Sequence, residues 1–580
     1  MNSRPSRNET IAYSAAFLIA LALRITLLGK LPLTDAEATL ALQALDISQG
    51  ARPALASNVA YINISAILFF VFGSTNFLAR LLPALAGSFL PLVPALFRDR
   101  LKARPALILA FFLAIDPALV ALSRQAGSSI LALTFVLVAA GFFLHGRSVL
   151  AGIFAALALL SGPALWPGLL GMLLAWMLSQ FMSARTQGEA GADTSKENPS
   201  EAAPASETTL ADSGSPSTDY RSLLTTLIAT LLVVSSLLLL APQGLGAWMG
   251  SLPAYIRGWA MPSSVPSSRM FLAVGAYQFF GVIFALIAIV RGWWDGSQRI
   301  IRLSLWGIVA FLLVIFYPAR QPADLIWLLV PLWALAALEI SRHIRVFPED
   351  RLETAGVVLF TIVLLAFAWV DLNAMYYTPF PSPQANTRLG LFIGAILLLI
   401  ASVVLVGMGW STTIARSGAT WGVSILLGLY TLGAAWGATG LRSLIAAELW
   451  DSSPRIAQAG MLAQTADDIS EWATGDPHNL QVLIQGIDSP ALFWALRFHD
   501  PQPVTALDPA STPEMVITPL QQELQLGASY RGQDFNWRQY PSWETLSPYN
   551  VLRWITFREV PIANETIIFW ARNDLFVDSE

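Results

Sequence analysis

The sequence IAYSAAFLIALALRITLLG (residues 11–29) is followed, after one lysine, by LPLTDAEATLALQAL (residues 31–45). The first stretch is apolar along nearly its whole length and is long enough to cross a bilayer as a helix. Asp35 and Glu37 in the second stretch therefore lie about one helical turn beyond the end of a predicted membrane span. An ionised side chain close to lipid is costly. The two carboxylates thus belong either to a solvated loop or to an active site at the membrane surface.

The composition is typical of a helical protein that crosses the bilayer many times. The 580 residues are 55% hydrophobic and 12% charged, whereas soluble domains carry about 25% charged residues. The chain has no cysteine, which excludes disulfides, thiolate nucleophiles and Cys-ligated metals. Its net charge is −4 and it has no basic tract, so nothing in the charge pattern indicates nucleic-acid binding.

Apolar stretches predict about thirteen transmembrane helices, and we expect the first to be retained rather than removed as a signal peptide. The predicted spans begin near Ile11, Phe77, Pro105, Ser128, Val149, Trp166, Leu223, Phe271, Leu303, Ala323, Thr354, Leu389 and Trp421. The apolar stretch 61–73 is shorter and predicts an interfacial or re-entrant helix. With this count the loops on the N-terminal side hold about 17 Lys and Arg and the opposite loops about eight, which predicts a cytoplasmic N-terminus and an extracytoplasmic C-terminal segment.

The same pattern divides the chain into four parts. Residues 1–182 form an N-terminal membrane half that contains a long first outer loop, 29–76. Residues 183–222 are rich in Ala, Ser, Glu, Pro and Gly and predict a disordered cytoplasmic linker. Residues 223–440 form a second membrane half. Residues 441–580 predict a small extracytoplasmic α/β or α+β domain.

Within the last part we expect an amphipathic helix near 455–473. The short runs NLQVLIQG, PEMVITP, VLRWITFREV and ETIIFWAR are expected to form strands between Pro and Asn/Asp turns.

Residues 34–45, TDAEATLALQAL, predict the start of a helix in the first outer loop. Thr34 or Asp35 is placed to cap this helix, and Glu37 is placed to interact with its positive end. On the residues alone, a structural role for the two acids and a functional one are both open. The two roles are also compatible, because a capping side chain is held in a fixed orientation.

Six segments of the N-terminal half follow one another in a distinctive order: TDAEA (34–38), SNVAYINISAILFFVFG (57–73), ARLLPALAG (79–87), RDRLKAR (98–104), IDPALVALSRQAG (115–127) and LLSGPALWPG (159–168). Their order resembles the GT-C membrane glycosyltransferases, in particular glycosyltransferase family 39, the protein O-mannosyltransferase-like and aminoarabinose-transferase-like superfamily. The family's adjacent Asp-Glu pair reads Asp-Ala-Glu here. Its basic residue before Pro-Pro-Leu falls at Ser57, with Asn58, Val59 and Ala60 following.

This resemblance implies an integral membrane glycosyltransferase that moves a sugar from a polyprenyl-phosphate carrier to an acceptor, with inversion at the sugar C1. It implies a carboxylate base, for which Asp35 is the first candidate, with Glu37 as its partner or as a hydrogen-bonding group for the substrate. The inserted Ala36 leaves the choice of base between Asp35 and Glu37 open. Cations would stabilise the departing phosphate, and the matching or outer-face cations are Arg124, Arg320, Lys30 and Arg80. The residues implied in substrate binding are Asn58, Tyr61 and Tyr317.

An alternative of a different class is a non-catalytic or transporter/flippase-like membrane protein with the same fold, which the altered acid motif favours. No His/Asp/Glu spacing predicts a metal-ligand cluster, so we expect no cofactor, although a divalent metal is left open. The expected partners are the lipid bilayer of the cell membrane, the polyprenyl-phosphate-linked sugar and an acceptor of unknown type, either a protein, a lipid or a glycan. No nucleic acid is expected.

Overall fold

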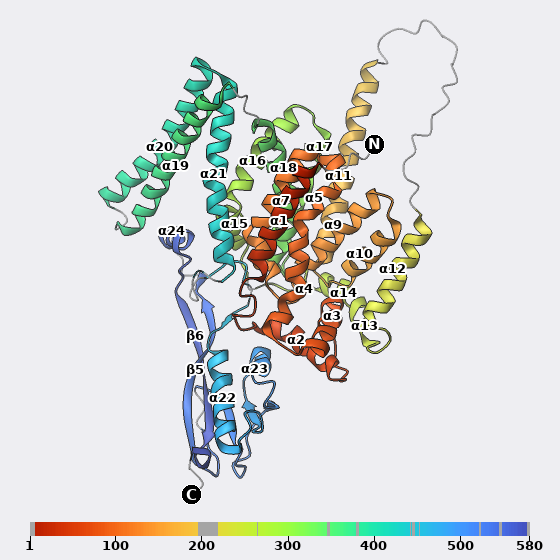
Figure 1. Cartoon of the computed structure of the whole chain (residues 1–580), viewed down its shortest axis with the longest axis vertical. Coiled ribbons are helices and arrows are strands. Elements are labelled where there is room, and N and C mark those ends of the chain that lie inside the picture. Colours follow the sequence, from red (N-terminus) through yellow and green to blue (C-terminus); the bar gives the residue numbers. More distant parts are fainter. Residues whose placement is uncertain are drawn as a thin grey trace.

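The structure is a computed structural model of the whole chain. It describes residues 6–194, 219–263, 265–344, 349–378, 382–440, 442, 447–451, 453–520, 524–543 and 548–576. Figure 1 shows a bundle of helices with a smaller domain of strands and helices attached at one end. The fold is therefore mainly helical, with one C-terminal sheet.

The first membrane half consists of eleven helices and one short 3₁₀ turn in the described residues. Their bounds are α1 Arg7–Ile25, α2 Asp35–Ser48, α3 Val59–Phe72, α4 Asn76–Phe89, η1 Leu90–Leu92, α5 Val93–Leu96, α6 Arg98–Leu101, α7 Ala103–Ile115, α8 Pro117–Ser123, α9 Ile130–Leu144, α10 Ser148–Leu159 and α11 Leu165–Thr194. The first outer loop thus contains two helices, α2 and α3, and α3 is the short apolar helix predicted at 61–73.

The second membrane half continues in the same all-helical manner. Its bounds are α12 Tyr220–Ser235, α13 Gln243–Met249, α14 Ser251–Arg257, α15 Ser267–Tyr277, α16 Phe279–Trp294, α17 Gln298–Phe316, η2 Pro322–Leu325, α18 Ile326–His343, α19 Arg351–Ala374, η3 Met375–Tyr377, α20 Pro383–Gly409 and α21 Thr412–Ala438. In Figure 1, α19 and α20 form a hairpin that projects from the side of the bundle next to α21.

The described helices do not confirm all thirteen predicted spans. Among the described residues, eight helices are long and apolar enough to cross a membrane, or up to ten if each of two bent pairs counts as one span. The bent pairs are α7 with α8, at 55°, and α15 with α16, at 89°. Near the other predicted starts the helices α9, α10 and α12 have 12 to 16 residues, which falls short of spanning length. Apolar composition identified these segments, but it did not reveal where each helix ends.

The predicted linker 183–222 is partly helical. Helix α11 continues to Thr194 and α12 already begins at Tyr220, while residues 195–218 lie outside the described residues.

The C-terminal domain is built on one six-stranded sheet with the order β1-β5-β6-β4-β2-β3. The strands are β1 Arg455–Ile456, β2 Val482–Gln485, β3 Gln502–Val504, β4 Met515–Pro519, β5 Tyr530–Pro541 and β6 Ile562–Arg572. Strand β2 pairs in parallel with β3 and β4, whereas the β4–β6, β5–β6 and β1–β5 pairs are antiparallel. The helices are α22 Ala459–Thr474, α23 Pro490–Ala495 and α24 Pro548–Phe557, and the 3₁₀ turn η5 covers Asn573–Phe576.

Two local predictions in this domain are wrong. The run VLRWITFREV is not a strand, because VLRWITF lies in helix α24. Pro548 opens this helix, a position that suits proline, and the helix buries Trp554 completely. Residues 455–456 are strand β1 rather than the start of the amphipathic helix, which begins at Ala459.

Buried polar side chains hold the break between α7 and α8. Arg24 at the end of α1 donates to the carbonyls of Leu113 and Ala114, at 3.1 and 2.9 Å, near the end of α7. Asp116 caps α8 by accepting from the Leu119 backbone N–H at 2.7 Å, and it also accepts from Trp333 Nε1 at 2.7 Å. Backbone groups freed at a helix break inside a membrane need such partners. The break therefore sets the direction in which α8 leaves the membrane part.

We expect Asp116→Leu to lower the free energy of unfolding by about 2–4 kcal/mol, because it removes the cap and leaves the Trp333 N–H buried without a partner. Asp116→Asn keeps one acceptor oxygen and should lose clearly less. Thermal unfolding of the purified protein in one detergent checks this difference. Equal losses for the two variants would contradict the proposed role of the Asp116 oxygens.

Candidate functional site at the first outer loop

Glu37 is buried at the base of helix α2. Thr34 caps the helix, and the T-x-x-E capping box is complete: the Glu37 N–H donates to Thr34 Oγ1 at 3.4 Å and Thr34 N–H donates to Glu37 Oε2 at 3.0 Å. Arg80 of α4 binds the carboxylate in a bidentate manner, with Nε to Oε1 and Nη2 to Oε2, each at 2.7 Å. The backbone N–H of Ala126 adds a third kind of contact, to Oε1 at 2.9 Å.

These contacts decide the charge of Glu37. Its side chain is only 6% exposed, and burial by itself raises the pKa of a carboxyl group. The positive charge of Arg80 and the hydrogen bonds from Arg80, Thr34 and Ala126 outweigh burial and hold the pKa of Glu37 below its ordinary value. Glu37 is therefore an ionised carboxylate with all its acceptor positions engaged.

Arg80 connects this pair to the chain that precedes α2. Its Nη1 donates to the carbonyls of Leu28, at 3.4 Å, and Leu31, at 2.7 Å, and its Nη2 donates to the Pro32 carbonyl at 2.8 Å. Together with the two bonds to Glu37, these contacts use all five N–H groups of the guanidinium. Arg80 thus fixes the connection between α1 and α2.

Asp35 points to a different part of the molecule. Its Oδ1 accepts from Ser489 Oγ at 2.5 Å and from the Ala491 N–H at 3.1 Å, and its Oδ2 accepts from Arg538 Nε at 2.7 Å. All three partners belong to the C-terminal domain. Ser489 and Ala491 lie where the chain leaves strand β2 and starts α23, and Arg538 lies on β5.

Residues two apart on a helix face different directions, at about 100° per residue. The structure therefore does not bring Asp35 and Glu37 together.

Further contacts attach α23 to the first outer loop. Trp494 Nε1 donates to Asn76 Oδ1 at 2.7 Å, and its ring lies 5.7 Å from that of Phe69. Arg497 donates to Ser74 Oγ at 3.0 Å and to the Ser74 carbonyl at 2.9 Å. The C-terminal domain and the first outer loop thus form a continuous interface around Asp35.

The loop between α8 and α9, residues 124–129, is where the surrounding segments meet. Besides the Ala126 contact with Glu37, the Gly127 carbonyl accepts from Asn58 Nδ2 at 3.0 Å and Gln125 Nε2 donates to the Trp450 carbonyl at 3.4 Å. Gly127 has a φ of +66°, and a Cβ there would lie 2.1 Å from Leu40 Cδ1. Only glycine fits this position, which brings α2 and α3 close to the loop.

Arg124 in this loop holds the end of α1. Its Nη1 donates to the carbonyls of Leu23, Arg24 and Thr26, at 3.2, 3.0 and 2.9 Å, and Nη2 donates to that of Leu27 at 3.4 Å. A cation at a helix C-terminus stabilises the free carbonyls there. Burial and the neighbouring charge of Arg80 lower the pKa of Arg124 to about 10, so that the side chain stays protonated at neutral pH.

The remaining predicted site residues differ in how far their side chains are buried. Tyr61 is completely buried and donates to the Ala79 carbonyl at 2.7 Å, so its hydroxyl serves the packing of α3 on α4. Lys30 is exposed. Arg320 is half-buried and donates to the Val265 carbonyl at 3.4 Å, and its Nε is buried without a partner among the described residues. Tyr317 stacks on Tyr255 with ring centres 5.0 Å apart.

Tyr317 belongs to a cluster of aromatic side chains. The Tyr317 hydroxyl donates to the Tyr255 carbonyl at 3.1 Å, and the ring of Trp259 lies edge-on, 5.4 Å from Tyr317. Ser129, in the loop between α8 and α9, donates to the Ala323 carbonyl at 3.4 Å. Ala323 lies only three residues beyond Arg320 in the chain. The segment that carries Tyr317 and Arg320 is thereby joined to the loop that contacts Glu37.

Sequence reasoning missed the segment 447–451, which connects the last helix to the sheet domain. Arg269 donates to the carbonyls of Leu449 and Asp451, at 3.0 and 2.8 Å. Glu448 is buried, accepts a hydrogen bond from the Tyr277 hydroxyl and lies 3.8 Å from Arg558. The signal was present as acids flanking an aromatic residue in AAELWD, directly after the last span.

The described part of the chain contains no group of three or more His, Cys, Asp and Glu side chains that could hold a metal ion. The polar groups around the first outer loop are carboxylates paired with arginines, hydroxyls and backbone amides.

Comparison with known proteins identifies the architecture. No family model matches the chain, and no curated protein matches it in sequence. Among solved structures, ArnT from Cupriavidus metallidurans bound to undecaprenyl phosphate is similar, with a TM-score of 0.55 and 13% identity over 98% of this chain and 99% of that chain. The apo state of the same ArnT gives a TM-score of 0.50 and 14% identity over the same shares.

A third structure is more distant. The Archaeoglobus fulgidus oligosaccharyltransferase, in complex with Zn and sulfate, has a TM-score of 0.36 and 14% identity over 88% of this chain and 68% of that chain.

We expect Glu37→Gln to lower stability by about 3–5 kcal/mol at neutral pH, the usual cost of breaking a buried ion pair. Because the folded-state pKa is lowered, this contribution is complete above the unfolded-state pKa of about 4.3 and is lost as pH falls through the folded-state pKa. The free energies of unfolding of wild type and variant, measured between pH 7 and pH 3, should therefore approach each other as the pH falls.

Glu9→Gln is the matched control, because the Glu9–Arg98 pair is more exposed, at 23% and 20% of the two side chains, and should contribute less. If the free energies of unfolding of wild type and Glu37→Gln differ by a constant amount down to pH 3, the carboxylate charge is not what Arg80 stabilises.

The likeness to ArnT covers both membrane halves and the C-terminal domain together, so that the chain has a GT-C fold like that of ArnT.

Proposed function

We propose that the protein is a membrane glycosyltransferase that transfers a sugar from a polyprenyl-phosphate carrier to an acceptor, at the membrane face that bears the C-terminal domain. The observation that carries this proposal is the whole-chain likeness to ArnT, a protein solved with undecaprenyl phosphate bound. The carboxylates and arginines of the first outer loop support it. On this proposal the N-terminus is cytoplasmic and the C-terminal domain is extracytoplasmic, in the cell membrane.

Asp35 is the base in this proposal. All acceptor positions of Glu37 are engaged by Arg80, Thr34 and Ala126, whereas the Asp35 side chain is 19% exposed and reaches solvent. Its partners Ser489 and Arg538 are on another domain, so a small separation of that domain frees both oxygens. Glu37 is then a positioning residue that keeps α2, and with it Asp35, in place.

The reaction follows from these roles. Asp35 accepts the proton of the acceptor hydroxyl, the hydroxyl oxygen attacks C1 of the sugar, and the bond from C1 to the phosphate oxygen breaks. Attack from the side opposite the phosphate inverts C1. A general base of this kind contributes about 10²–10⁴-fold to the rate.

The cations differ in what they can offer the leaving phosphate. Arg80 has no N–H group left, because its five donors are engaged within the loop. The contacts of Arg124 use both terminal nitrogens for the end of α1. Lys30 is exposed and Arg320 has an unpartnered Nε among the described residues. We therefore assign phosphate binding first to Arg320, three residues beyond Tyr317, and to Lys30, and we assign Arg80 and Arg124 to positioning.

One observation favours a second candidate function. Both oxygens of Asp35 are engaged by Ser489, Ala491 and Arg538, as expected if Asp35 only anchors the C-terminal domain. The protein would then be a non-catalytic or flippase-like relative that binds the lipid-linked sugar without transferring it.

Purified protein incubated with radiolabelled polyprenyl-phosphate sugars and a cell-envelope extract as acceptor source tests the two functions. A transferase releases polyprenyl phosphate in a 1:1 ratio to labelled product, as the balance of the reaction requires. A flippase, reconstituted in vesicles, moves the lipid-linked sugar from one leaflet to the other without releasing polyprenyl phosphate. That result would overturn the proposal.

We expect Arg320→Gln to raise KM for the lipid-linked donor about tenfold, the effect of losing one charge-assisted hydrogen bond. Arg257→Gln is the matched control, because Arg257 is exposed on α14 and its Nε contacts only the Pro253 carbonyl within its own helix. Similar KM values for the two variants would remove Arg320 from the donor site.

A further inference from the structure

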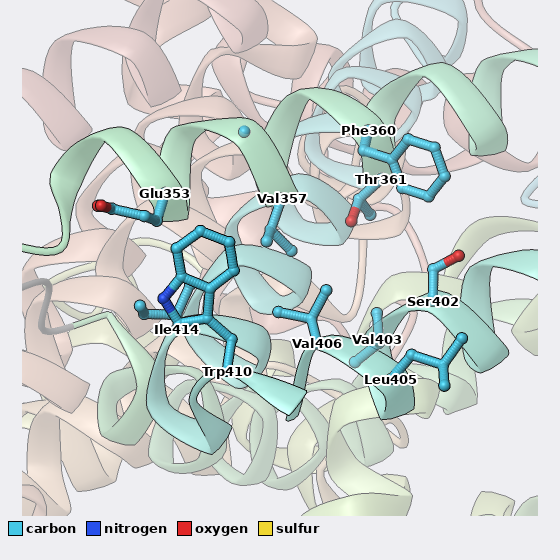
Figure 2. Close-up of a pocket in the computed structure, with 11 residues that line it drawn as sticks. Glu353, Val357, Phe360, Thr361, Ser402, Val403, Leu405, Val406, Trp410 and Ile414 are labelled. Atoms are coloured by element: carbon cyan, nitrogen blue, oxygen red, sulfur yellow. The ribbon is translucent and has the colours of Figure 1, made fainter. Parts of the chain in front are cut away.

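A groove opens between α19 and α20, away from the first outer loop. Its volume is about 470 Å³, and apolar side chains make up most of its lining. Figure 2 shows Glu353 and Trp410 at one end, Thr361 and Ser402 toward the other, and Val357 and Val406 between them. Glu353 and Thr361 are eight residues apart on α19, so the groove follows the helix for about 12 Å.

The groove is at the membrane face opposite the C-terminal domain. The far end of α19 contacts that domain, since Thr556 of α24 hydrogen-bonds Asn373. Helix α19 has 24 residues and is about 36 Å long, the thickness of a bilayer core with part of its interface. Glu353, near the beginning of α19, is therefore at the level of the lipid head groups, and Trp410 beside it occupies the usual position of an interfacial tryptophan.

Two polar atoms in the groove are buried without a partner among the described residues. These are Oε2 of Glu353 and Oγ1 of Thr361, a residue that is completely buried. A buried carboxylate oxygen without a donor is costly. The cost is removed if a ligand supplies an N–H or O–H donor, and most favourably a positively charged one.

Exposed arginines occur at the helix ends on the same membrane face as this end of the groove. Arg351 is the first residue of α19, Arg416 follows the groove residue Ile414 by two positions on α21, and Arg342 is in the last turn of α18. One membrane face therefore carries a carboxylate and several exposed cations, and an apolar channel leads away from the carboxylate.

We propose that this groove binds a phospholipid with a primary ammonium head group, such as phosphatidylethanolamine. The ammonium donates to Glu353, the lipid phosphate lies at the membrane face that carries the exposed arginines, and one acyl chain lies along Val357 and Val406 toward Thr361. A quaternary ammonium head has no N–H to donate, and a glycerol head brings no positive charge, so both fit less well. This site is independent of the sugar-transfer reaction.

The groove can be filled by substitution without disturbing the fold. Gly356 lines the groove, and a Cβ added to it meets no atom within 4 Å. Gly356→Leu therefore occupies the volume proposed for the acyl chain. Gly394 on α20 is equally open but does not line the groove, and Gly394→Leu is its matched control. Glu353→Gln removes the charge, and Glu349→Gln at an exposed position nearby is its control.

The full-length protein is reconstituted in nanodiscs of equal parts phosphatidylethanolamine, phosphatidylcholine and phosphatidylglycerol, then transferred to detergent, and the retained lipids are counted by native mass spectrometry. We expect phosphatidylethanolamine to be retained about tenfold over phosphatidylcholine. Glu353→Gln and Gly356→Leu should each lose about tenfold of this retention, with unchanged Tm, while Glu349→Gln and Gly394→Leu keep it.

Equal retention of phosphatidylcholine or phosphatidylglycerol would overturn the proposed head group. Unchanged phosphatidylethanolamine retention in Gly356→Leu would overturn the groove as its site, and a loss of equal size in the two control variants would do the same. If Glu353→Gln unfolds, Gly356→Leu still decides, because its substituent points into open space.

Discussion

The buried ion pair between Glu37 and Arg80 is the interaction on which the arrangement of the first outer loop depends. A buried pair of charges is tolerated only when the remaining donors and acceptors are satisfied, and here Arg80 engages three backbone carbonyls in addition to Glu37. The pair joins α2 to α4, and the Ala126 contact joins both to the loop before α9. The end of α1, the start of α2 and that loop are thus held as one unit.

The position of Asp35 follows from this unit. Since Glu37 faces inward, helical geometry turns Asp35 outward, where it contacts the C-terminal domain through Ser489 and Arg538. Two acids that look like one motif in the sequence therefore have separate tasks. One orders the loop, and the other is shared between the loop and the C-terminal domain, which follows the last helix far along the chain. In the proposed reaction, this shared contact makes access to the base depend on the position of the C-terminal domain.

Local features of this region could be predicted from the sequence. Thr34 followed three residues later by Glu37 is a capping-box signal, and the helix start at 34–35 was found where it was expected. The short helix at 61–73, the mainly helical fold and the C-terminal strands β2, β4 and β6 also follow from composition and periodicity. The ordered motifs of the membrane half predicted the GT-C fold, which the likeness to ArnT confirms.

What could not be predicted depends on contacts between distant residues. Arg538 and Ser489 are 503 and 454 positions from Asp35, and nothing in RGQDFNWRQY indicates a partner in the first loop. Strand β5 was missed because its polar residues lack a clear alternation. The described helices confirm eight to ten of the thirteen predicted spans, since α9, α10 and α12 are shorter than spanning length and hydropathy does not register where a helix ends. The assignment of Arg124 to phosphate rested on a motif match, and its bonds to the end of α1 became apparent only in three dimensions.

The central claim is that Asp35 is the base and that the C-terminal domain holds it only temporarily. The most direct test is the turnover number of sugar transfer for Asp35→Asn and Arg538→Gln, measured with saturating lipid-linked donor. The account predicts that Asp35→Asn, which still accepts a hydrogen bond from Ser489, lowers kcat by at least about 100-fold, while Arg538→Gln keeps kcat within a few-fold of wild type or raises it. Wild-type turnover in Asp35→Asn would contradict the account.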